Sequence, residues 1–440
     1  MKIAIIGGAG VRVPLLVGGL ARSDLRISDI ALFDIDKIRQ PVIAELAAQM
    51  APGVRVRSEQ AVESAIEGAS FVITSIRVGG AAQRARDEAI AIAHDVVGQE
   101  TVGAVGFAMA VRTIPPMVEY GRLVARLAPR AWLINFSNPV SIITQALHQA
   151  LSAEAPGAKA DRLIGICDTP MEMFEDAAHA LGLPATVCSY DYFGLNHLGW
   201  LRDVLFEGEG QLHRIWQDDA RLMSAYRSPL FEPERLRQLK LLPTEYLYYY
   251  YRPDVALANM KKAGSSRGQH VAKLTEEFFA RSAEARSAKA DLIESYQRYL
   301  AARDSSYMAI ETGETKPRVK PDWAELSGYD RIALMTMRAI VHDQGAVIPL
   351  DVANNGTLPF LKNDDIVEVP CRVGKDGPRA QIVAAVPQHA RELIETVKVY
   401  ERATVKAALT GDRNDAIDAL ALNPLVPSRD KAAQLVQELL

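Results

Sequence analysis

A chain of 440 residues, 49% hydrophobic and 24% charged, is long enough for two packed domains and has the composition of an ordinary globular protein. Its 50 basic and 54 acidic residues give a net charge of −4, which excludes an overall positive field for nucleic acid or an anionic membrane. No apolar stretch is long enough to span a bilayer, and three scattered cysteines exclude a disulfide framework, so we expect a cytoplasmic protein.

Apolar strands alternate with helices in the first part of the chain. Strands that are apolar throughout are typical of a parallel sheet covered on both faces by helices. The predicted fold class is therefore α/β with an N-terminal Rossmann domain, and we divide the chain into domains at 1–168 and 169–440. The predicted strands are 2–6, 30–36, 71–76, 131–136 and 163–167, and the predicted helices are 13–23, 40–50 and 114–128.

The second part of the chain mixes helices and strands. A run of tyrosines and apolar helices near the C-terminus predict a homodimer or homotetramer. We predict helix from about 272 to 303, a polar loop over 300–325, strands within 346–356 and 365–373, and helices at 387–409 and 428–440.

A glycine-rich turn follows the first strand. Gly7, Gly8 and Gly10 let backbone amides approach a pyrophosphate at a helix N-terminus, although Val13 stands where G-x-G-x-x-G has its third glycine. Asp34 ends the second strand, where an acid binds the ribose hydroxyls and repels a 2′-phosphate. The pattern predicts NAD binding, and a generic strand–turn–helix is the alternative.

Asn138 precedes Pro139 in NFSNPVS, where the fourth strand meets a helix. An asparagine followed by proline is typical of an N-cap with proline at the first helical position. The same loop lies at the carboxyl ends of the parallel strands, where open α/β sheets bind ligands. Both roles stay open for Asn138.

Cys167 and His197 each follow a strand-like run, in LIGICDTP and YFGLNHLGW. A thiolate and an imidazole can hold a metal between them, and two protein ligands leave positions open for substrate oxygens. Ligand softness favours zinc or iron over manganese at a thiolate. The alternative is that both side chains are simply buried.

Tyrosines and arginines supply further candidates. Five tyrosines lie in TEYLYYYYRPD, and one of them would act as a base if a nearby cation lowered its pKa, while the others pack. Guanidinium groups match phosphate geometry, yet most arginines pair with carboxylates. Arginines of interest are Arg77, Arg84, Arg86, Arg112 and Arg267.

Together these motifs resemble glycoside hydrolase family 4, the NAD- and metal-dependent glycosidases, over almost the whole chain. That family departs from the two-carboxylate chemistry of most glycosidases. The strings that carry the resemblance are IRVGG (76–80), VVGQETVGAVGFAMAVRTIP (96–115), NFSNP (135–139), GICDTP (165–170), GLNHLGW (194–200), PTEYLYYYY (243–251), NNGTLPFL (354–361) and VEVPC (367–371).

The resemblance implies a catalytic apparatus. Cys167 and His197 would be ligands of Mn²⁺, Tyr246 the base, and Asp168 the acid of the phospho-α-glucosidase branch. NAD⁺ would take a hydride from sugar carbon 3, and the metal would polarise the resulting ketone. Tyr246 would then remove the proton from carbon 2, the aglycone would leave from carbon 1, and water and the hydride would add back.

The resemblance also implies a substrate and a second domain. The substrate would be a phosphorylated disaccharide or aryl glucoside bound by Arg84, Asn138 and Arg267, although the spacing from Tyr246 to Arg267 differs by about one residue. The C-terminal domain would have the α+β architecture of lactate and malate dehydrogenases.

Several specificities and classes stay open. The general character of GLNHLGW, YLYYYY and VEVPC favours a 6-phospho-β-glucosidase, whereas Asp168 favours a 6-phospho-α-glucosidase. An unphosphorylated α-galactosidase or α-glucuronidase is a further alternative. Outside the family, the rivals are a metal-free NAD-dependent 2-hydroxy acid dehydrogenase and an NAD-binding sensor without catalysis. His197, matched to Cys167, argues against the dehydrogenase.

Overall fold

One sheet runs through the molecule in this computed structural model, which describes residues 1–154, 160–226, 230–287, 291–313 and 328–440. Its first half is parallel, in the order β3-β2-β1-β4-β5-β6, which is the strand order of a Rossmann domain. The predicted α/β class is confirmed. The parallel strands are β1 (Lys2–Ile6), β2 (Asp29–Phe33), β3 (Arg55–Glu59), β4 (Phe71–Thr74), β5 (Trp132–Asn135) and β6 (Leu163–Gly165).

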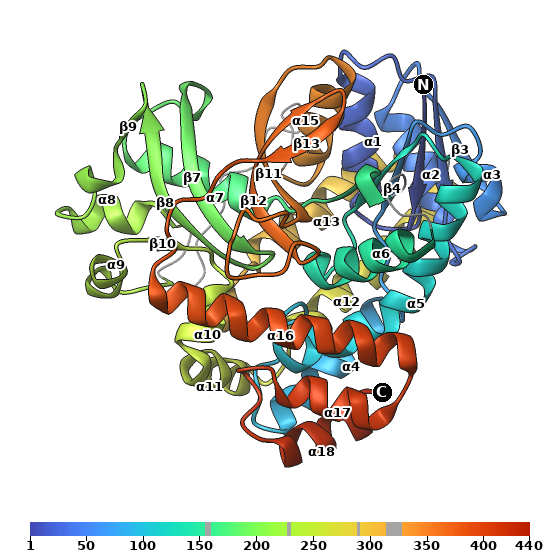
Figure 1. The fold of residues 1–440 in the computed structure, drawn as a ribbon. Coiled ribbons are helices and arrows are strands. Elements are labelled where there is room, and N and C mark those ends of the chain that lie inside the picture. Colours follow the sequence, from blue (N-terminus) through green and yellow to red (C-terminus); the bar gives the residue numbers. More distant parts are fainter. Residues whose placement is uncertain (155–159, 227–229, 288–290, 314–327) are drawn as a thin grey trace.

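The second half of the sheet is antiparallel and continues from β6 in the order β11-β12-β7-β8-β10. The join is the pairing of Asp351 on β11 with Gly165 on β6 (Figure 1). The antiparallel strands are β7 (Cys188–Leu195), β8 (Leu198–Phe206), β9 (Glu209–Gly210), β10 (Leu242–Pro243), β11 (Ala346–Ala353), β12 (Ile366–Gly374) and β13 (Gly377–Ala380).

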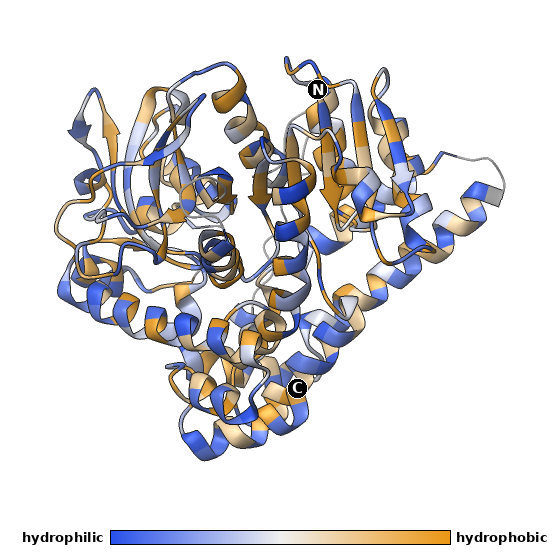
Figure 2. Ribbon diagram, turned by 45° about the vertical axis from the view of Figure 1, so that its right-hand side comes forward, coloured by the Kyte–Doolittle hydropathy of each residue, from blue (hydrophilic) through white to orange (hydrophobic). Residues whose placement is uncertain are grey.

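Helices cover the sheet. From β1 the chain adds strands towards β3 on one side, and from β4 it adds strands towards β6 on the other. Because the crossovers are right-handed in both directions, α1 and α2 lie on one face of the parallel sheet and α5 and α6 on the other. Apolar residues gather on the strands and on the inward sides of the helices (Figure 2). The helices of the first half are α1 (Val13–Arg22), α2 (Arg39–Met50), α3 (Val62–Ile66), α4 (Gly80–Ala93), α5 (Gly103–Leu127), α6 (Val140–Glu154) and α7 (Thr169–Ala180).

The remaining helices belong to the second half of the chain. In Figure 1, α16 runs below the antiparallel strands towards α5, and α17 and α18 return beneath it. Among the described residues, no helix is long and apolar enough to cross a membrane. These helices are α8 (Asp219–Ser224), α9 (Pro233–Leu239), α10 (Leu247–Tyr251), α11 (Pro253–Ala263), α12 (Arg267–Ser287), α13 (Ile293–Ser305), α14 (Ala309–Thr312), α15 (Gly328–Val341), α16 (Gln388–Thr410), α17 (Arg413–Ala421) and α18 (Arg429–Leu439).

Three departures from the sequence predictions have physical reasons. Strand β3 was not predicted because its sequence, RVRSE, is polar, as suits the edge of a sheet. Helix α5 begins at Gly103 rather than at 114, since residues 103–110 are buried on all sides and show no helical period. The loop expected over 300–325 is wrong for residues 300–305 and 309–312, which are helical, and residues 314–325 lie outside the described residues.

A buried ion pair ties α16 to the sheet. The side chains of Lys398 and Glu401 are 0% and 5% exposed, and they contact each other. Lys398 Nζ donates to the carbonyl oxygen of Ile366 at 2.6 Å, and Ser141 Oγ on α6 donates to Glu401 Oε2 at 2.9 Å. The pair therefore joins α16, α6 and the start of β12.

We predict that Lys398→Met lowers the free energy of unfolding by about 3–5 kcal/mol, because it leaves the Glu401 carboxylate buried without its cation. Adding Glu401→Gln should restore most of that loss. Urea denaturation measures both changes. Lys406→Met is the control on the same helix: its ion pair with Asp415 is solvent-exposed, with Lys406 66% exposed, and its loss should have little effect on the free energy of unfolding. Equal losses for the Lys398 and Lys406 variants would contradict the prediction.

Candidate active site

A cavity of about 380 Å³ opens at the carboxyl ends of the parallel strands. Loops after four of these strands reach it: Gly10 follows β1, Ser75 follows β4, Asn138 follows β5, and Cys167 follows β6. The antiparallel half adds His197 from the turn between β7 and β8. The cavity thus collects residues from both halves of the chain, as expected for a ligand site of an α/β sheet. Asp168, Tyr246 and Arg267 also line it.

The glycine turn, Gly7–Gly10, closes tightly against the sheet. Gly7 has φ of 99°, and a Cβ there would lie 2.1 Å from the carbonyl oxygen of Ser75. Asp34 Oδ2 accepts from the Ala9 amide at 2.9 Å, which joins the end of β2 to the turn. Each carboxylate oxygen keeps a second lone pair for a ribose hydroxyl. Gly10 lines the cavity, whereas Gly7 and Gly8 shape the turn behind it.

Cys167 and His197 meet as the sequence predicts. Cys167 Sγ lies 3.7 Å from His197 Nε2, and both side chains are buried. Burial lowers the pKa of His197 to about 3, so the imidazole is neutral, the form that binds metals. Burial also raises the pKa of the Cys167 thiol well above its usual value, so a metal would have to displace its proton.

The donor set fits a cation that keeps open positions. His197 Nδ1 is buried without a hydrogen-bonding partner in the described part of the chain. The same residues contain no group of three or more His, Cys, Asp or Glu that could enclose a metal. Cys167 and His197 would thus supply two ligands and leave the rest to water or substrate oxygens.

Tyr246 lies against His197. Its ring stacks on the His197 ring, with centroids 3.7 Å apart and planes at 8°. Burial raises the pKa of Tyr246 well above its usual value, and the neighbouring Glu245 adds to the effect, while a hydrogen bond from Tyr307 opposes it. The Tyr307 hydroxyl also bonds to Glu245. In the protein alone Tyr246 is therefore protonated, and a nearby cation would favour its phenolate.

Asn138 is not the N-cap that its sequence suggests. The amide of Ile143 bonds to the carbonyl oxygen of Pro139, so α6 begins at Val140 and Asn138 lies before the cap. Asn138 Oδ1 is buried without a hydrogen-bonding partner among the described residues. The prediction that Asn138 caps the helix is therefore wrong, and its role in binding a ligand stays a prediction. Asn135 is structural, because its amide bonds to Thr144 Oγ1 at 2.9 Å.

Carboxylates neutralise the arginines that follow β4. Arg84 Nε lies 2.7 Å from Glu88 Oε1, and Arg84 Nη1 lies 2.6 Å from Glu100 Oε2. Arg84 does not line the large cavity but a small adjoining hollow, and Glu100 borders both. Arg77 also pairs with Glu100, at 2.6 Å. The expectation that such arginines pair with carboxylates holds for Arg84 and Arg77, and direct contact between Arg84 and substrate stays a prediction.

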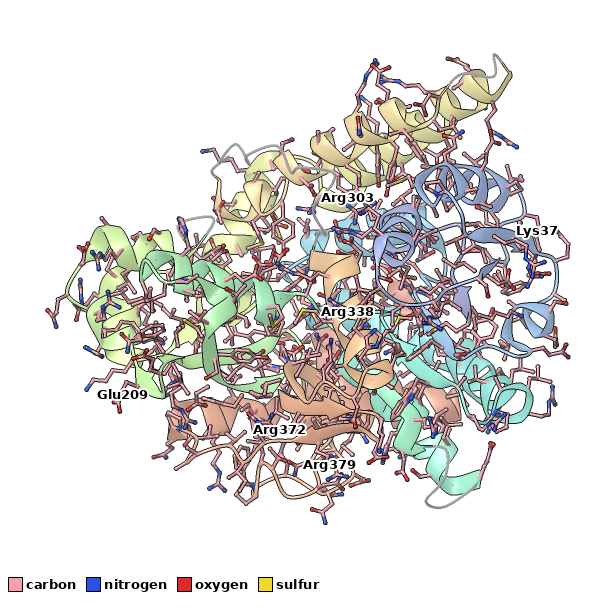
Figure 3. The ribbon with its side chains drawn as sticks, turned by 90° about the horizontal axis from the view of Figure 1, so that it is seen from above. Lys37, Glu209, Arg303, Arg338, Arg372 and Arg379 are labelled. Atoms are coloured by element: carbon pink, nitrogen blue, oxygen red, sulfur yellow. The ribbon has the colours of Figure 1, made fainter. Side chains whose placement is uncertain are left out.

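The sequence analysis missed three cations that line the cavity, Arg12, Arg22 and Arg303. Arg12 follows the glycine turn, and Arg303 lies on α13, yet both line the cavity. Figure 3 shows Arg303 between α13 and the first half of the chain, whereas Glu209 and Arg379 lie at the periphery. Tyr296 on α13 donates to the carbonyl oxygen of Val11 at 2.6 Å, which holds the helix over the glycine turn. No motif marks Arg303, because only the fold brings α13 to the turn.

Most of the chain matches one family. A sequence profile described as family 4 glycosyl hydrolase matches residues 2–183, and one described as the family 4 glycosyl hydrolase C-terminal domain matches residues 192–426. A 6-phospho-beta-glucosidase of Escherichia coli (strain K12) is 30% identical over 100% of this chain and 94% of its own. A phospho-alpha-glucosidase of Clostridium acetobutylicum is 27% identical over 100% of this chain and 97% of its own.

Solved structures share the fold. The 6-phospho-beta glucosidase from Thermotoga maritima, solved with manganese, NAD+ and glucose-6-phosphate, has a TM-score of 0.81 at 26% identity, with 100% of this chain and 97% of that one covered. A lactate dehydrogenase from a deep-sea metagenome has a TM-score of 0.55 at 12% identity, with 93% and 98% covered. The latter likeness concerns the fold alone, and it confirms the expected relation to lactate and malate dehydrogenases.

We predict that Glu100→Gln lowers the free energy of unfolding at pH 7 by about 3 kcal/mol or more, because it leaves Arg77 and Arg84 without their shared carboxylate. Burial alone would raise the pKa of Glu100, but the guanidinium groups of Arg84 and Arg77 hold it well below its usual range. The ionised Glu100 therefore stabilises the fold fully above the unfolded pKa, about 4.3, and progressively less as the pH falls below it.

Urea denaturation between pH 7 and pH 3 tests this dependence. The difference between wild type and Glu100→Gln should be constant above about pH 5 and shrink at lower pH. Glu119→Gln is the control, since Glu119 is 66% exposed in its pair with Arg122. A difference that grows on acidification would reject the assigned charge state.

Proposed function

Because this chain belongs to glycoside hydrolase family 4, we propose that it hydrolyses 6-phospho-β-glucosides with NAD and Mn²⁺ as cofactors. The observation that carries the proposal is the meeting of Cys167, His197 and Tyr246 in a cavity that the glycine turn also borders. A thiol, a neutral imidazole and a tyrosine suit an elimination assisted by a redox step, for which two flanking carboxylates are not needed. The names of the Escherichia coli and Thermotoga maritima relatives support a phosphorylated β-glucoside.

The chain offers a place for each cofactor. The glycine turn and Asp34 would hold the pyrophosphate and ribose of NAD, and Cys167 and His197 would hold Mn²⁺. When bound, NAD would supply a reversible hydride acceptor for sugar carbon 3, and Mn²⁺ would supply a Lewis acid for the neighbouring sugar oxygens. Cys167 must be kept as a free thiol for this purpose, so we propose the cytoplasm as the working compartment.

The other residues act on the sugar. Tyr246 removes the proton from carbon 2, and Asp168 protonates the oxygen that leaves carbon 1. The amide oxygen of Asn138, which has no hydrogen-bonding partner in the described part of the chain, accepts from a sugar hydroxyl. Arg267 and Arg303, which line the cavity, bind the 6-phosphate, and their guanidinium groups suit its geometry. Water then adds at carbon 1, so the net reaction is hydrolysis.

Arg84 has an indirect part in this scheme. Its guanidinium is occupied by Glu88 and Glu100, so we propose that it fixes Glu100 and thereby the arginines that face the phosphate.

A second candidate is a 6-phospho-α-glucosidase. Asp168, next to Cys167 and lining the cavity, is the observation that favours it. The phospho-alpha-glucosidase of Clostridium acetobutylicum has nearly the same identity to this chain as the β-specific relative. Because the proposed chemistry begins at carbons 3 and 2, both anomers fit the same residues.

We predict hydrolysis of nitrophenyl β-glucoside 6-phosphate only when NAD⁺, Mn²⁺ and a thiol reductant are all present, with nitrophenol absorbance as the measurement. Each additive is withheld in turn, and the α-anomer and the unphosphorylated β-glucoside are tested in parallel. Turnover of the α-anomer alone would replace the proposal by its alternative. Net accumulation of NADH would instead indicate a dehydrogenase, because the proposed cycle returns the hydride.

We predict that Tyr246→Phe lowers kcat by about 10²–10⁴-fold, since the ring stays stacked on His197 but the base is lost. NAD and Mn²⁺ binding, followed by fluorescence and by electron paramagnetic resonance, should be unchanged. Tyr250→Phe is the matched control, because Tyr250 belongs to the same run but packs against the core and does not line the cavity. Full activity in Tyr246→Phe would remove this residue from the mechanism.

A further inference from the structure

Two carboxylic acids lie between the strands that lead to Cys167 and His197. A single row of register partners crosses four strands: Gly165 on β6, Asp351 on β11, Glu368 on β12 and Gly194 on β7. Asp351 and Glu368 are 0% and 1% exposed. Asp351 and Glu368 thus lie at the centre of the sheet. Gly165 and Gly194, which flank them in the row, belong to the strands that precede Cys167 and His197.

Glu368 is bonded to the hairpin that carries His197. Its Oε2 accepts from the Tyr192 hydroxyl at 2.5 Å, and its Oε1 accepts from Asn196 Nδ2 at 3.2 Å. Asn196 directly precedes His197, which has the left-handed φ of 62°. Glu368 therefore holds Asn196 in place, and with it the backbone that orients the His197 side chain.

Glycines let the backbone approach the acid pair. A Cβ at Gly165 would lie 2.7 Å from Asp351 Cβ, and a Cβ at Gly199 would lie 1.9 Å from the Tyr192 hydroxyl. Gly165 is the last residue of β6, two residues before Cys167, and Gly199 belongs to the strand that follows His197. The acids are therefore packed against both segments that carry the metal-binding residues.

Above about pH 7 the acid pair carries a negative charge that no described cation neutralises. Burial raises the pKa of Asp351 well above its usual value, and the neighbouring Glu368 adds to the effect. Burial raises the pKa of Glu368 to about 7, while hydrogen bonds from Tyr192 and Asn196 oppose the increase. In the described part of the chain Glu368 has no basic partner, and the nearby Lys398 is paired with Glu401. A buried charge without a counter-charge is costly.

We propose that Glu368, supported by Asp351, is a positioning residue of the metal site: its charge offsets that of a divalent cation on Cys167 and His197, and its bond to Asn196 orients His197. Mn²⁺ with a Cys167 thiolate carries one net positive charge, which the charge of Glu368 balances. This inference rests on the proposed function, because it presumes that Cys167 and His197 bind the metal. Groups that orient metal ligands in this way typically contribute about 10–100-fold to metal affinity.

The test is the Mn²⁺ affinity of Glu368→Gln, measured at pH 8 on the full, metal-free chain by electron paramagnetic resonance of free Mn²⁺. Glutamine keeps the size of the side chain and can still bond to Tyr192 and Asn196, so the variant removes chiefly the charge. We expect the dissociation constant to rise about 10–100-fold, while the melting temperature of the metal-free protein does not fall and NAD binding is unchanged.

Asp365→Asn is the matched control. Asp365 is also buried, at 1% exposed, and lies just before β12, but it pairs with Arg402 instead of the His197 hairpin. This variant should melt at a lower temperature and bind Mn²⁺ as the wild type does. An unchanged Mn²⁺ affinity in Glu368→Gln overturns the inference alone, and so do equal losses of affinity in both variants. If the wild type itself binds no Mn²⁺, the proposed function fails and the inference with it.

Discussion

The row of paired residues that joins β6 to β7 through β11 and β12 determines where the candidate site forms. At about 4.8 Å per strand, Gly165 and Gly194 lie three strand spacings apart. Cys167 and His197 extend from beyond the ends of these outer strands and meet at 3.7 Å. Without β11 and β12 between them, the parallel and antiparallel halves would not share a sheet, and the thiol and the imidazole would not meet. The glycine turn on one half and the β7–β8 hairpin with His197 on the other thereby face one cavity.

Charge in this molecule is arranged around that cavity. Glu100 pairs with Arg77 and Arg84, so these two guanidinium groups are held in place before any ligand arrives. A ligand that binds cations already fixed in position does not have to offset the entropy lost when mobile side chains become ordered. Arg303 adds a cation from α13, a helix anchored to the glycine turn through Tyr296. Under the proposed function, the same helix would bring the phosphate-binding group and the cofactor turn into contact.

The sequence indicates the parts of this arrangement that depend on local pattern. The apolar strands, the glycine turn with Asp34, and the Cys167 and His197 motifs are all recognisable because each lies within a few residues. Arg303 and the acids Asp351 and Glu368 carry no such signal, since only the pairing of distant strands and helices brings them to the site. Asn138 shows the opposite error. Its sequence is typical of an N-cap, but the helix begins later, and the Asn138 side chain does not cap it.

The burial of Cys167 affects its susceptibility to oxidation. Thiolates, rather than thiols, are the forms that peroxides oxidise. Because burial keeps Cys167 protonated when no metal is present, the side chain at the centre of the site is also in its least oxidisable state. Cys188 is more exposed and lies away from the cavity. Oxidation should therefore reach Cys188 before Cys167, which leaves the thiol at the centre of the site in its reduced form.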